Sequence, residues 1–144
     1  MEAISSYIGC DVYARGKVIG RITDFLIDLK NKNIRGITCL SNTGIIRTRF
    51  YVEKSGIVHL DRNGTVVDKR MIKYKKSFLE EFSVISPQKD FFNGSMGDIY
   101  IEPDTLKIKS VSVKRGFLDD LIYGRDFFDI NDITLTEKGI VKRD

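Results

Sequence analysis

The chain has 144 residues, of which 42% are hydrophobic and 31% charged, with a formal net charge of +4. This composition excludes an intrinsically disordered protein and is typical of a globular one, either a single ordinary domain or two unusually small ones. The longest uncharged stretch, 36–46, is too short to span a bilayer, which needs about 20 apolar residues. The N-terminus carries Glu2 where a secretory leader would be basic. We therefore expect a soluble, cytoplasmic protein.

The charge is distributed unevenly along the chain. Residues 1–87 contain 15 basic and 9 acidic side chains, whereas residues 88–144 contain 9 basic and 11 acidic ones. A basic half and a mildly acidic half could attract each other, or present a polarised surface to partners.

Strand patterns dominate the first half of the chain, as short runs of Ile, Val, Phe, Tyr and Thr separated by glycine or Asn-Gly. Gly16 and Gly20 predict a tight hairpin rather than a phosphate loop, because neither a GK[ST] ending nor a helix follows. Over 25–30 hydrophobic residues alternate with Asp28 and Lys30, which predicts a half-buried strand. Asn63-Gly64 predicts a two-residue hairpin turn with positive φ at both positions. The predicted strands are 18–29, 34–40, 44–52, 57–60 and 65–67.

A basic segment follows, and its conformation is open between a helix and a strand. Met71, Tyr74, Phe78 and Phe82 recur at the spacing of one helix face. The lysines come first and the glutamates last, which is the wrong order for a helix dipole. Residues 71–75 could equally form a strand, and Pro87 ends either element.

The second half repeats the order of the first, with predicted strands at 98–101, 106–114, 125–128, 133–136 and 140–141. The spacing of three and then two residues in Ile34, Ile37 and Cys39 recurs in the second half. With this spacing, the inward-facing positions change from one alternate set of residues to the other in the middle of the strand. This change predicts a β-bulge at the same place in both halves. The paired segments are Gly20-Arg21-Ile22 with Gly97-Asp98-Ile99; Ile34, Ile37 and Cys39 with Ile108, Val111 and Val113; Phe50-Tyr51 with Phe127-Phe128; and Val58, Leu60, Gly64 and Val66 with Ile133, Leu135, Gly139 and Val141.

We therefore predict an all-β chain made of two tandem small β-barrels joined by a short linker. The first copy covers 1–70, the basic linker 71–87 and the second copy 88–144. Each half alone would have a thin core, so the two copies should share an interface. Small gaps are needed in the alignment, and Pro103 suggests an edge or a bulge in the second copy.

These residues resemble a known family. The run 16–22, then 26–28, then an apolar strand from Ile34, resembles the opening of a PRC-barrel domain, named for the H subunit of the photosynthetic reaction centre. The second copy looks the same from Asn93 onward, and 116–125 is similar to a segment of tandem bacterial PRC-barrel proteins. The resemblance implies small six-stranded barrels that serve as assembly modules. In the reaction centre such a domain caps a membrane complex, and in a ribosome-maturation factor a similar one binds a ribosomal protein.

No arrangement of residues predicts catalysis, a metal site or a cofactor. His59 is the single histidine, and it is expected to face solvent on the alternation of the strand if Val58 and Leu60 on either side of it face inward. Cys10 and Cys39 are expected to be reduced thiols, with a disulfide as the alternative, and with His59 they would lack a fourth zinc ligand. Asp24 with Asp28, or Asp119 with Asp120, could bind a cation or act as an acid–base pair. Asp28 is interpreted instead as a turn residue, and Asp119 and Asp120 as residues that cap or solvate a short helical turn.

The basic cluster is the candidate interaction surface. Its residues are Arg47, Arg49, Lys69, Arg70, Lys73, Lys75 and Lys76. It could contact a protein partner, RNA or a ribosome, or an anionic membrane surface. A solvated linker is the alternative. We expect a non-enzymatic adaptor that binds proteins, with an RNA- or ribosome-associated factor as the second hypothesis. Self-association is a further alternative.

Two aromatic pairs, Phe91-Phe92 and Phe127-Phe128, place one ring of each pair away from its own core if they lie in strands. We expect the outward rings to line the interface between the two copies, with an exposed docking patch as the alternative.

Overall fold

The computed structural model describes residues 1–28, 31–42, 47–74, 84–85, 90–91, 94–114, 126–129, 133–136 and 139–142, and side chains within 1–28, 31–42, 47–74 and 98–112. These residues form β-strands and three 3-10 helices, which confirms the all-β prediction. Within the described ranges no helix combines the length and apolar character that crossing a membrane requires.

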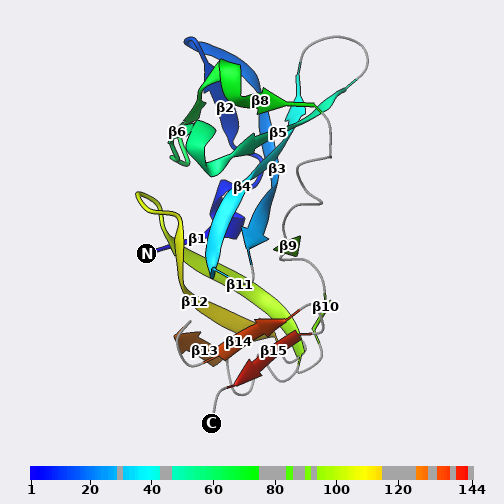
Figure 1. Cartoon of the computed structure of the whole chain (residues 1–144), viewed down its shortest axis with the longest axis vertical. Coiled ribbons are helices and arrows are strands. Elements are labelled where there is room, and N and C mark those ends of the chain that lie inside the picture. The colour runs from blue at the N-terminus through cyan, green and yellow to red at the C-terminus, as the bar shows by residue number, and fades with distance from the viewer. Residues whose placement is uncertain are drawn as a thin grey trace.

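Among the described residues, thirteen strands belong to one curled sheet, and β14 and β15 form a separate hairpin. Figure 1 shows this arrangement. The main path of the sheet runs β1-β11-β12-β4-β3-β2-β7-β6. The described pairings give a half-barrel and establish no pair of closed tandem barrels. The elements are β1 Glu2–Ala3, η1 Ile4–Tyr7, β2 Asp11–Ala14, β3 Lys17–Asp28, β4 Asn33–Ser41, β5 Arg49–Glu53, η2 Lys54–Gly56, β6 Ile57–His59, β7 Thr65–Val67, η3 Lys69–Met71, β8 Ile72–Lys73, β9 Val84–Ile85, β10 Asp90–Phe91, β11 Gly94–Glu102, β12 Lys107–Lys114, β13 Asp126–Asp129, β14 Ile133–Thr136 and β15 Gly139–Lys142.

The first hairpin turn has the geometry that its glycine predicts. Arg15 and Gly16 connect β2 to β3, with φ of 51° and 74°, and Ala14 pairs with Lys17 on either side. Positive φ at both central residues is the two-residue turn whose twist matches that of the strands. The tight hairpin is therefore confirmed, although the strand that precedes it, β2, was not among the predicted ones.

The end of β3 differs from the prediction of a half-buried strand. Phe25, Leu26, Ile27 and Asp28 are all buried, so both faces of the strand are covered here. The burial of Asp28 is possible because neighbouring groups donate hydrogen bonds to its carboxylate. Its carboxylate accepts from the backbone N–H of Asn31 at 3.1 Å and from the side-chain amide of the same residue at 2.9 Å. The prediction that Asp28 serves a turn is confirmed.

The predicted bulge is present in both halves. Between β3 and β4 the register leaves Arg35 unpaired, and between β11 and β12 it leaves Lys109 unpaired, which is 74 positions later. A second bulge repeats at the same offset, with Thr23 on β3 and Gly97 on β11. The match of Gly20 to Gly97 is therefore wrong, because Gly97 is a bulge residue equivalent to Thr23. At the corrected offset the two hairpins align without a gap.

The positions of Pro103 and of Phe127-Phe128 also differ from the prediction. Pro103 lies in the turn after β11 rather than within a strand. Phe127 pairs with Ser112 as Tyr51 pairs with Thr38, so Phe127-Phe128 corresponds to Tyr51-Val52, one residue from the predicted match. The side chains of both aromatic pairs lie outside the described ranges, and their proposed interface role stays a prediction.

The two halves meet at the tips of these hairpins. The Ile34 N–H donates to the Leu106 carbonyl at 2.8 Å, and the Ile108 N–H donates to the Lys32 carbonyl at 3.2 Å. Lys32 and Leu106, the acceptors, are also 74 positions apart and share a positive φ of 52° and 58°. The contact is therefore reciprocal, as around a two-fold axis. In addition β1 leaves the first half and pairs with β11.

One hydrophobic core crosses this junction. Phe25, Ile27 and Ile34 from the first half belong to the same buried cluster as Ile101 and Ile108 from the second. Burying apolar surface from both halves together stabilises each more than either could achieve alone. The shared interface expected from the small size of each half is thus present at the hairpins.

The β6–β7 hairpin departs from the Asn-Gly turn prediction. Neither Asn63 nor Gly64 has a positive φ. Instead Asp61 organises the turn: its carboxylate accepts from the Asn63 N–H at 2.7 Å and its carbonyl from the Gly64 N–H at 3.2 Å. A register shift between Ile57 and His59 leaves Val58 bulged and 67% exposed, so of the two neighbours of His59 only Leu60 faces inward.

The start of the linker is a strand rather than a helix. Met71 ends η3, and Ile72 and Lys73 form β8, which pairs with β5. Val84 and Ile85 form β9, which pairs with β3. The residues on which a linker helix depends, Phe78 and Phe82, lie outside the described ranges.

Candidate functional site

The residues of the predicted basic surface differ in their contacts: some pair with carboxylates, and others are exposed. Arg70 is tied to Asp68, with its Nη2 at 3.0 Å and its Nε at 3.2 Å from the carboxylate, and this pair lowers the pKa of Asp68. Lys73 Nζ lies 3.6 Å from Glu53. Arg47, Arg49 and Lys69 are exposed and make no ion pair within the described residues. Lys75 and Lys76 lie outside those residues.

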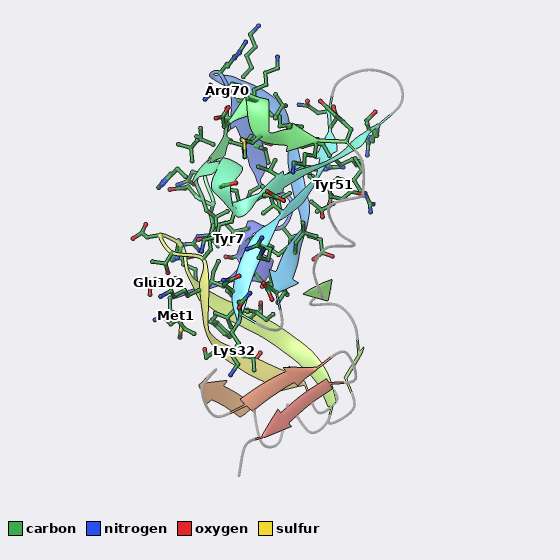
Figure 2. All side chains as sticks on the ribbon, viewed as in Figure 1. Met1, Tyr7, Lys32, Tyr51, Arg70 and Glu102 are labelled. Carbon is green, nitrogen blue, oxygen red and sulfur yellow. The ribbon has the colours of Figure 1, made fainter. Side chains whose placement is uncertain are left out.

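Sequence reasoning missed two basic residues, Arg15 and Arg21, that lie close to members of the predicted basic surface or to their partners. Figure 2 labels Arg70 of that surface. Arg15 is exposed in the first turn, close enough to Asp68 to contribute to its lowered pKa. Arg21 shares a cavity of about 420 Å³ with Arg47. The other residues that line it are Asp11, Gly20, Leu40, Ser41 and Asn42. Neither arginine lies in a charge-rich run, so only the fold brings them to the predicted surface.

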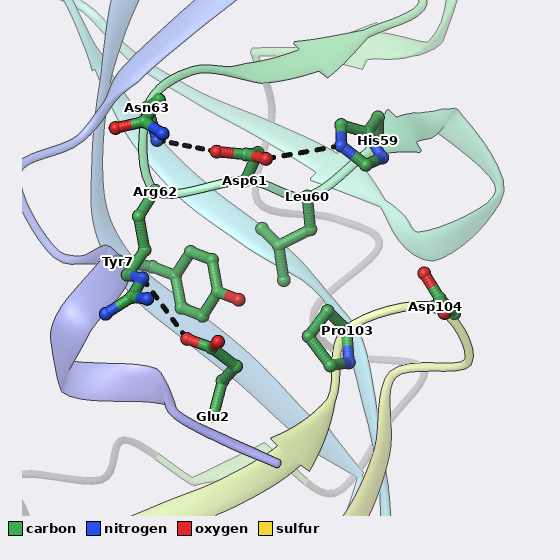
Figure 3. Close-up of a pocket in the computed structure, with 9 residues that line it drawn as sticks. All are labelled: Glu2, Tyr7, His59, Leu60, Asp61, Arg62, Asn63, Pro103 and Asp104. Carbon is green, nitrogen blue, oxygen red and sulfur yellow. Dashed lines mark hydrogen bonds and ion pairs between the residues drawn. The ribbon is translucent and has the colours of Figure 1, made fainter.

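A second cavity, of about 480 Å³, lies where the two halves come together (Figure 3). Three separate parts of the chain line it: the N-terminal segment, the β6–β7 hairpin and the turn between β11 and β12. The lining residues are Glu2, Tyr7, His59, Leu60, Asp61, Arg62, Asn63, Pro103 and Asp104. The volume is that of sites that hold small ligands or single side chains.

Tyr7 occupies this cavity because η1 is held from two sides. The Ser5 N–H and hydroxyl both donate to the Asp98 carboxylate on β11, the former at 3.3 Å. The Tyr7 ring packs edge-on against Phe25, with 6.1 Å between ring centroids. The hydroxyl points into the space between Leu60 and Pro103 (Figure 3). A pattern based on strands gave no reason to select this tyrosine.

An ion pair and a histidine–carboxylate contact lie among the residues that line the cavity. Arg62 Nε lies 3.2 Å from Glu2 Oε2, and His59 Nε2 lies 3.4 Å from Asp61 Oδ2. The backbone N–H of Asn63, followed by His59, lowers the pKa of Asp61, so this carboxylate stays charged. His59 faces solvent as predicted, with 61% of its side chain exposed.

The Tyr7 side chain is almost completely buried, and its hydroxyl stays protonated at neutral pH. The residue is 2% exposed, and burial, together with the carboxylates of Glu2 and Asp61, raises its pKa to about 12, with Arg62 acting in the opposite sense. Within the described residues no group donates to the hydroxyl or accepts from it. An uncharged, unpartnered hydroxyl at a cavity wall is available to bind a ligand.

The other predicted candidates have structural roles or lie apart. Cys10 and Cys39 are free thiols, and burial raises the pKa of Cys39 to about 12. Asp24 accepts from the Phe25 N–H at 2.8 Å beside its bulge, and Asp98 accepts from the Ile99 N–H at 2.9 Å in the same way. Among the described residues no cluster of three or more His, Cys, Asp or Glu could hold a metal. Asp119 and Asp120 fall outside them.

Comparison with known protein families gives a match. The model of the family described as "PRC-barrel domain" matches residues 1–72, which is half of the chain. These residues hold the whole first half of the fold, including the β6–β7 hairpin and most of the lining of the cavity at the junction. No curated protein matches the chain.

Proposed function

This chain belongs to the PRC-barrel family, and from that premise we propose that it is a cytoplasmic, non-enzymatic adaptor that docks a protein partner on its first half. The observation that carries the proposal is the exposed apolar pair on the β6–β7 hairpin. Val58 is 67% and Val66 37% exposed. β6 also ends the main path of the sheet, so its outer edge has no partner strand within the described residues.

Val58 lies on this edge strand, whereas Val66 lies on β7, which pairs with both β6 and β2. An exposed apolar side chain at an unpaired edge, next to a second one on the neighbouring strand, is typical of a surface that receives another chain. Edge strands offer free N–H and C=O groups, which a partner segment can extend by adding a strand. The bulge at Val58 keeps the edge short and turns that side chain outward, which limits uncontrolled pairing while leaving an apolar contact.

We include in the proposal that the second half is a second copy of the same unit, completing a tandem of small barrels. Support comes from the two bulges at a constant offset, from the aspartates that cap them, and from the shared positive φ of Lys32 and Leu106. A duplicated unit would give an adaptor two related surfaces.

A second candidate function, an RNA- or ribosome-associated factor, is favoured by the basic end of the first half. Arg21 and Arg47 line one cavity. Tyr74, which is 65% exposed, packs against Phe50, the neighbour of Arg49, with 6.5 Å between ring centroids. Arginines beside an exposed ring suit phosphates and a stacked base. An anionic membrane surface would use the same charges without the ring.

Capture of tagged protein from its native cell extract, with and without nuclease, separates these functions. We expect the wild-type chain to retain a discrete set of proteins that survives nuclease and moderate salt. The double variant Val58→Lys, Val66→Lys should lose that set, whereas Arg47→Gln, Arg49→Gln should keep it. Both variants change exposed side chains, so their melting temperatures should match the wild type.

The opposite pattern would replace the adaptor with the second candidate. In that case the retained material contains RNA or ribosomal proteins, disappears with nuclease or salt, and depends on the two arginines rather than on the valines. Retention of anionic vesicles by the arginines, insensitive to nuclease, would point to the membrane surface instead. Sedimentation equilibrium of the pure protein identifies a second copy of the chain as the partner.

A further inference from the structure

The cavity at the junction has an unbalanced set of charges. Its lining contains three carboxylates, Glu2, Asp61 and Asp104, against the Arg62 guanidinium and the His59 imidazole. Whether or not His59 carries a proton, the lining is net negative. An anionic ligand would be repelled, and a cationic group would be attracted more strongly than at an open surface, because the cavity walls exclude part of the solvent.

The two basic side chains of the lining, Arg62 and His59, already have carboxylate partners. Arg62 pairs with Glu2 at 3.2 Å, and His59 pairs with Asp61 at 3.4 Å. Three polar lining side chains make no hydrogen bond or ion pair with another described residue: Asp104, Tyr7 and Asn63. The Asp104 carboxylate and the Tyr7 hydroxyl differ from the Asn63 amide in carrying no N–H donor of their own. The carboxylate accepts only, and the hydroxyl oxygen can accept as well, so both suit a ligand rich in N–H donors.

Tyr7 makes this a built site rather than a chance group of surface acids. Its side chain is almost completely buried, yet its hydroxyl is directed at the cavity and lacks a partner (Figure 3). A hydroxyl that reaches the cavity in this way exchanges hydrogen bonds with solvent or with a ligand there. A guanidinium, which is planar and carries five N–H donors, can reach a hydroxyl and a carboxylate at the same time.

We propose that this cavity binds the guanidinium of an arginine side chain presented by the protein partner, between Tyr7 and Asp104. This inference rests on the proposed function, since the cavity continues directly from the exposed edge. His59 lines it, and His59 is the last residue of β6, next to Val58. A partner strand along β6 would carry an arginine into the cavity while apolar neighbours cover Val58 and Val66.

An NMR titration tests the site with the full-length protein and a defined probe. The probe is Nα-acetyl-arginine methylamide, and its uncharged citrulline counterpart is the control ligand. We expect the arginine probe to shift the backbone amide signals of the cavity lining, and the citrulline probe to bind at least about 10-fold more weakly, because it lacks the charge. The lysine analogue should fall between the two.

The variants assign the binding to Asp104 and Tyr7. Asp104→Asn, at an exposed turn, should weaken the arginine probe about 5-fold to 10-fold, and Tyr7→Phe by several-fold. Asp11→Asn removes a carboxylate from the other cavity and should leave the affinity unchanged. Equal binding of citrulline, unaltered affinity in Asp104→Asn, or shifts outside the lining would overturn the assignment. If Tyr7→Phe fails to fold, Asp104→Asn still decides the outcome.

Partner capture separates the failure of this inference from failure of the adaptor proposal. If Asp104→Asn retains the same proteins as the wild type, while Val58→Lys, Val66→Lys loses them, the edge docks a partner without an arginine in the cavity. If the valine variant also retains them, the adaptor proposal itself is wrong.

Discussion

At Gly36 the backbone of β4 passes directly beside that of β5. A Cβ atom at this position would collide with the Val52 carbonyl oxygen and press on the Glu53 backbone. Neither obstacle is the end of a flexible side chain, so the strands themselves would have to separate. The glycine is required by its neighbours and not by its own conformation.

Gly36→Ala should therefore lower the free energy of unfolding by about 1–3 kcal/mol, the usual cost of overpacking. Urea denaturation followed by circular dichroism measures the change. Val58→Ala, at an exposed position, serves as the control and should stay within about 0.5 kcal/mol of the wild type. A Gly36→Ala variant as stable as the control would show that β4 and β5 can move apart freely.

Cys39 illustrates how burial makes a residue sensitive to alkaline pH. Its thiol is completely buried, which raises its pKa from 9.0 to about 12. Between these values the unfolded chain loses the proton and the folded chain keeps it, so stability falls as pH rises through this window. Below pH 9 the contribution is fully present.

We expect the free energy of unfolding to decline from pH 9 upward, and less steeply in Cys39→Ala. A thiol reagent should label Cys10 in the folded protein and reach Cys39 only on unfolding. The raised pKa of Tyr7 lowers the free energy of unfolding further above pH 10. The wild type and Cys39→Ala are therefore compared between pH 9 and 10, where the cysteine contribution is separate from that of Tyr7. Rapid labelling of both thiols at neutral pH would contradict the burial of Cys39.

At the scale of elements, the β2–β3 hairpin depends on its two turn residues having positive φ. Gly16 has a φ of 74° with open space around a Cβ. Any penalty at this position is therefore conformational, whereas the penalty at Gly36 is steric. Asn tolerates this region of φ, while a β-branched side chain does not.

Gly16→Val should cost about 1–2 kcal/mol of stability, and Gly16→Asn a few tenths at most. Thermal unfolding of the two variants alongside the wild type provides the measurement. Equal melting temperatures for Val and Asn would mean that the turn adopts another conformation.

Sequence patterns predicted elements better than they predicted the faces those elements present. Spacing alone located the bulges at Arg35 and Lys109, because a bulge changes which side chains point inward. Matching glycines misled the alignment at Gly97, since glycine there occupies a bulge and not the strand position of Gly20. The exposure of Val58 could not be predicted, because nothing in a three-residue strand reveals a register shift.

The candidate site was less predictable still. The basic cluster was visible as a run of charges, but its pairing with Asp68 and Glu53 depends on turns and strand pairing. The cavity at the junction joins Tyr7, Arg62 and Asp104, which lie far apart in the sequence and occur in no motif. Such a site follows only from how the two halves pack together.

At the scale of the whole molecule, the continuous core predicts that both halves unfold together. Ile101, on β11, is completely buried in the same cluster as Phe25 and Ile34. Ile101→Ala should cost about 2–5 kcal/mol and should expose Cys39, in the other half, at a correspondingly lower urea concentration. Thiol labelling across a urea series measures this coupling. Unchanged protection of Cys39 would mean that the halves unfold separately.

The reciprocal bonds between the two hairpin tips have a consequence for how the molecule responds to dilution. Two equivalent tips that each donate one hydrogen bond and accept one form the kind of contact found in symmetric dimers. In this protein both tips belong to one chain, so mass action does not govern their association. The effective concentration of one tip near the other is fixed by the connecting chain. The junction therefore remains closed at protein concentrations at which a dimer built on the same contact would separate.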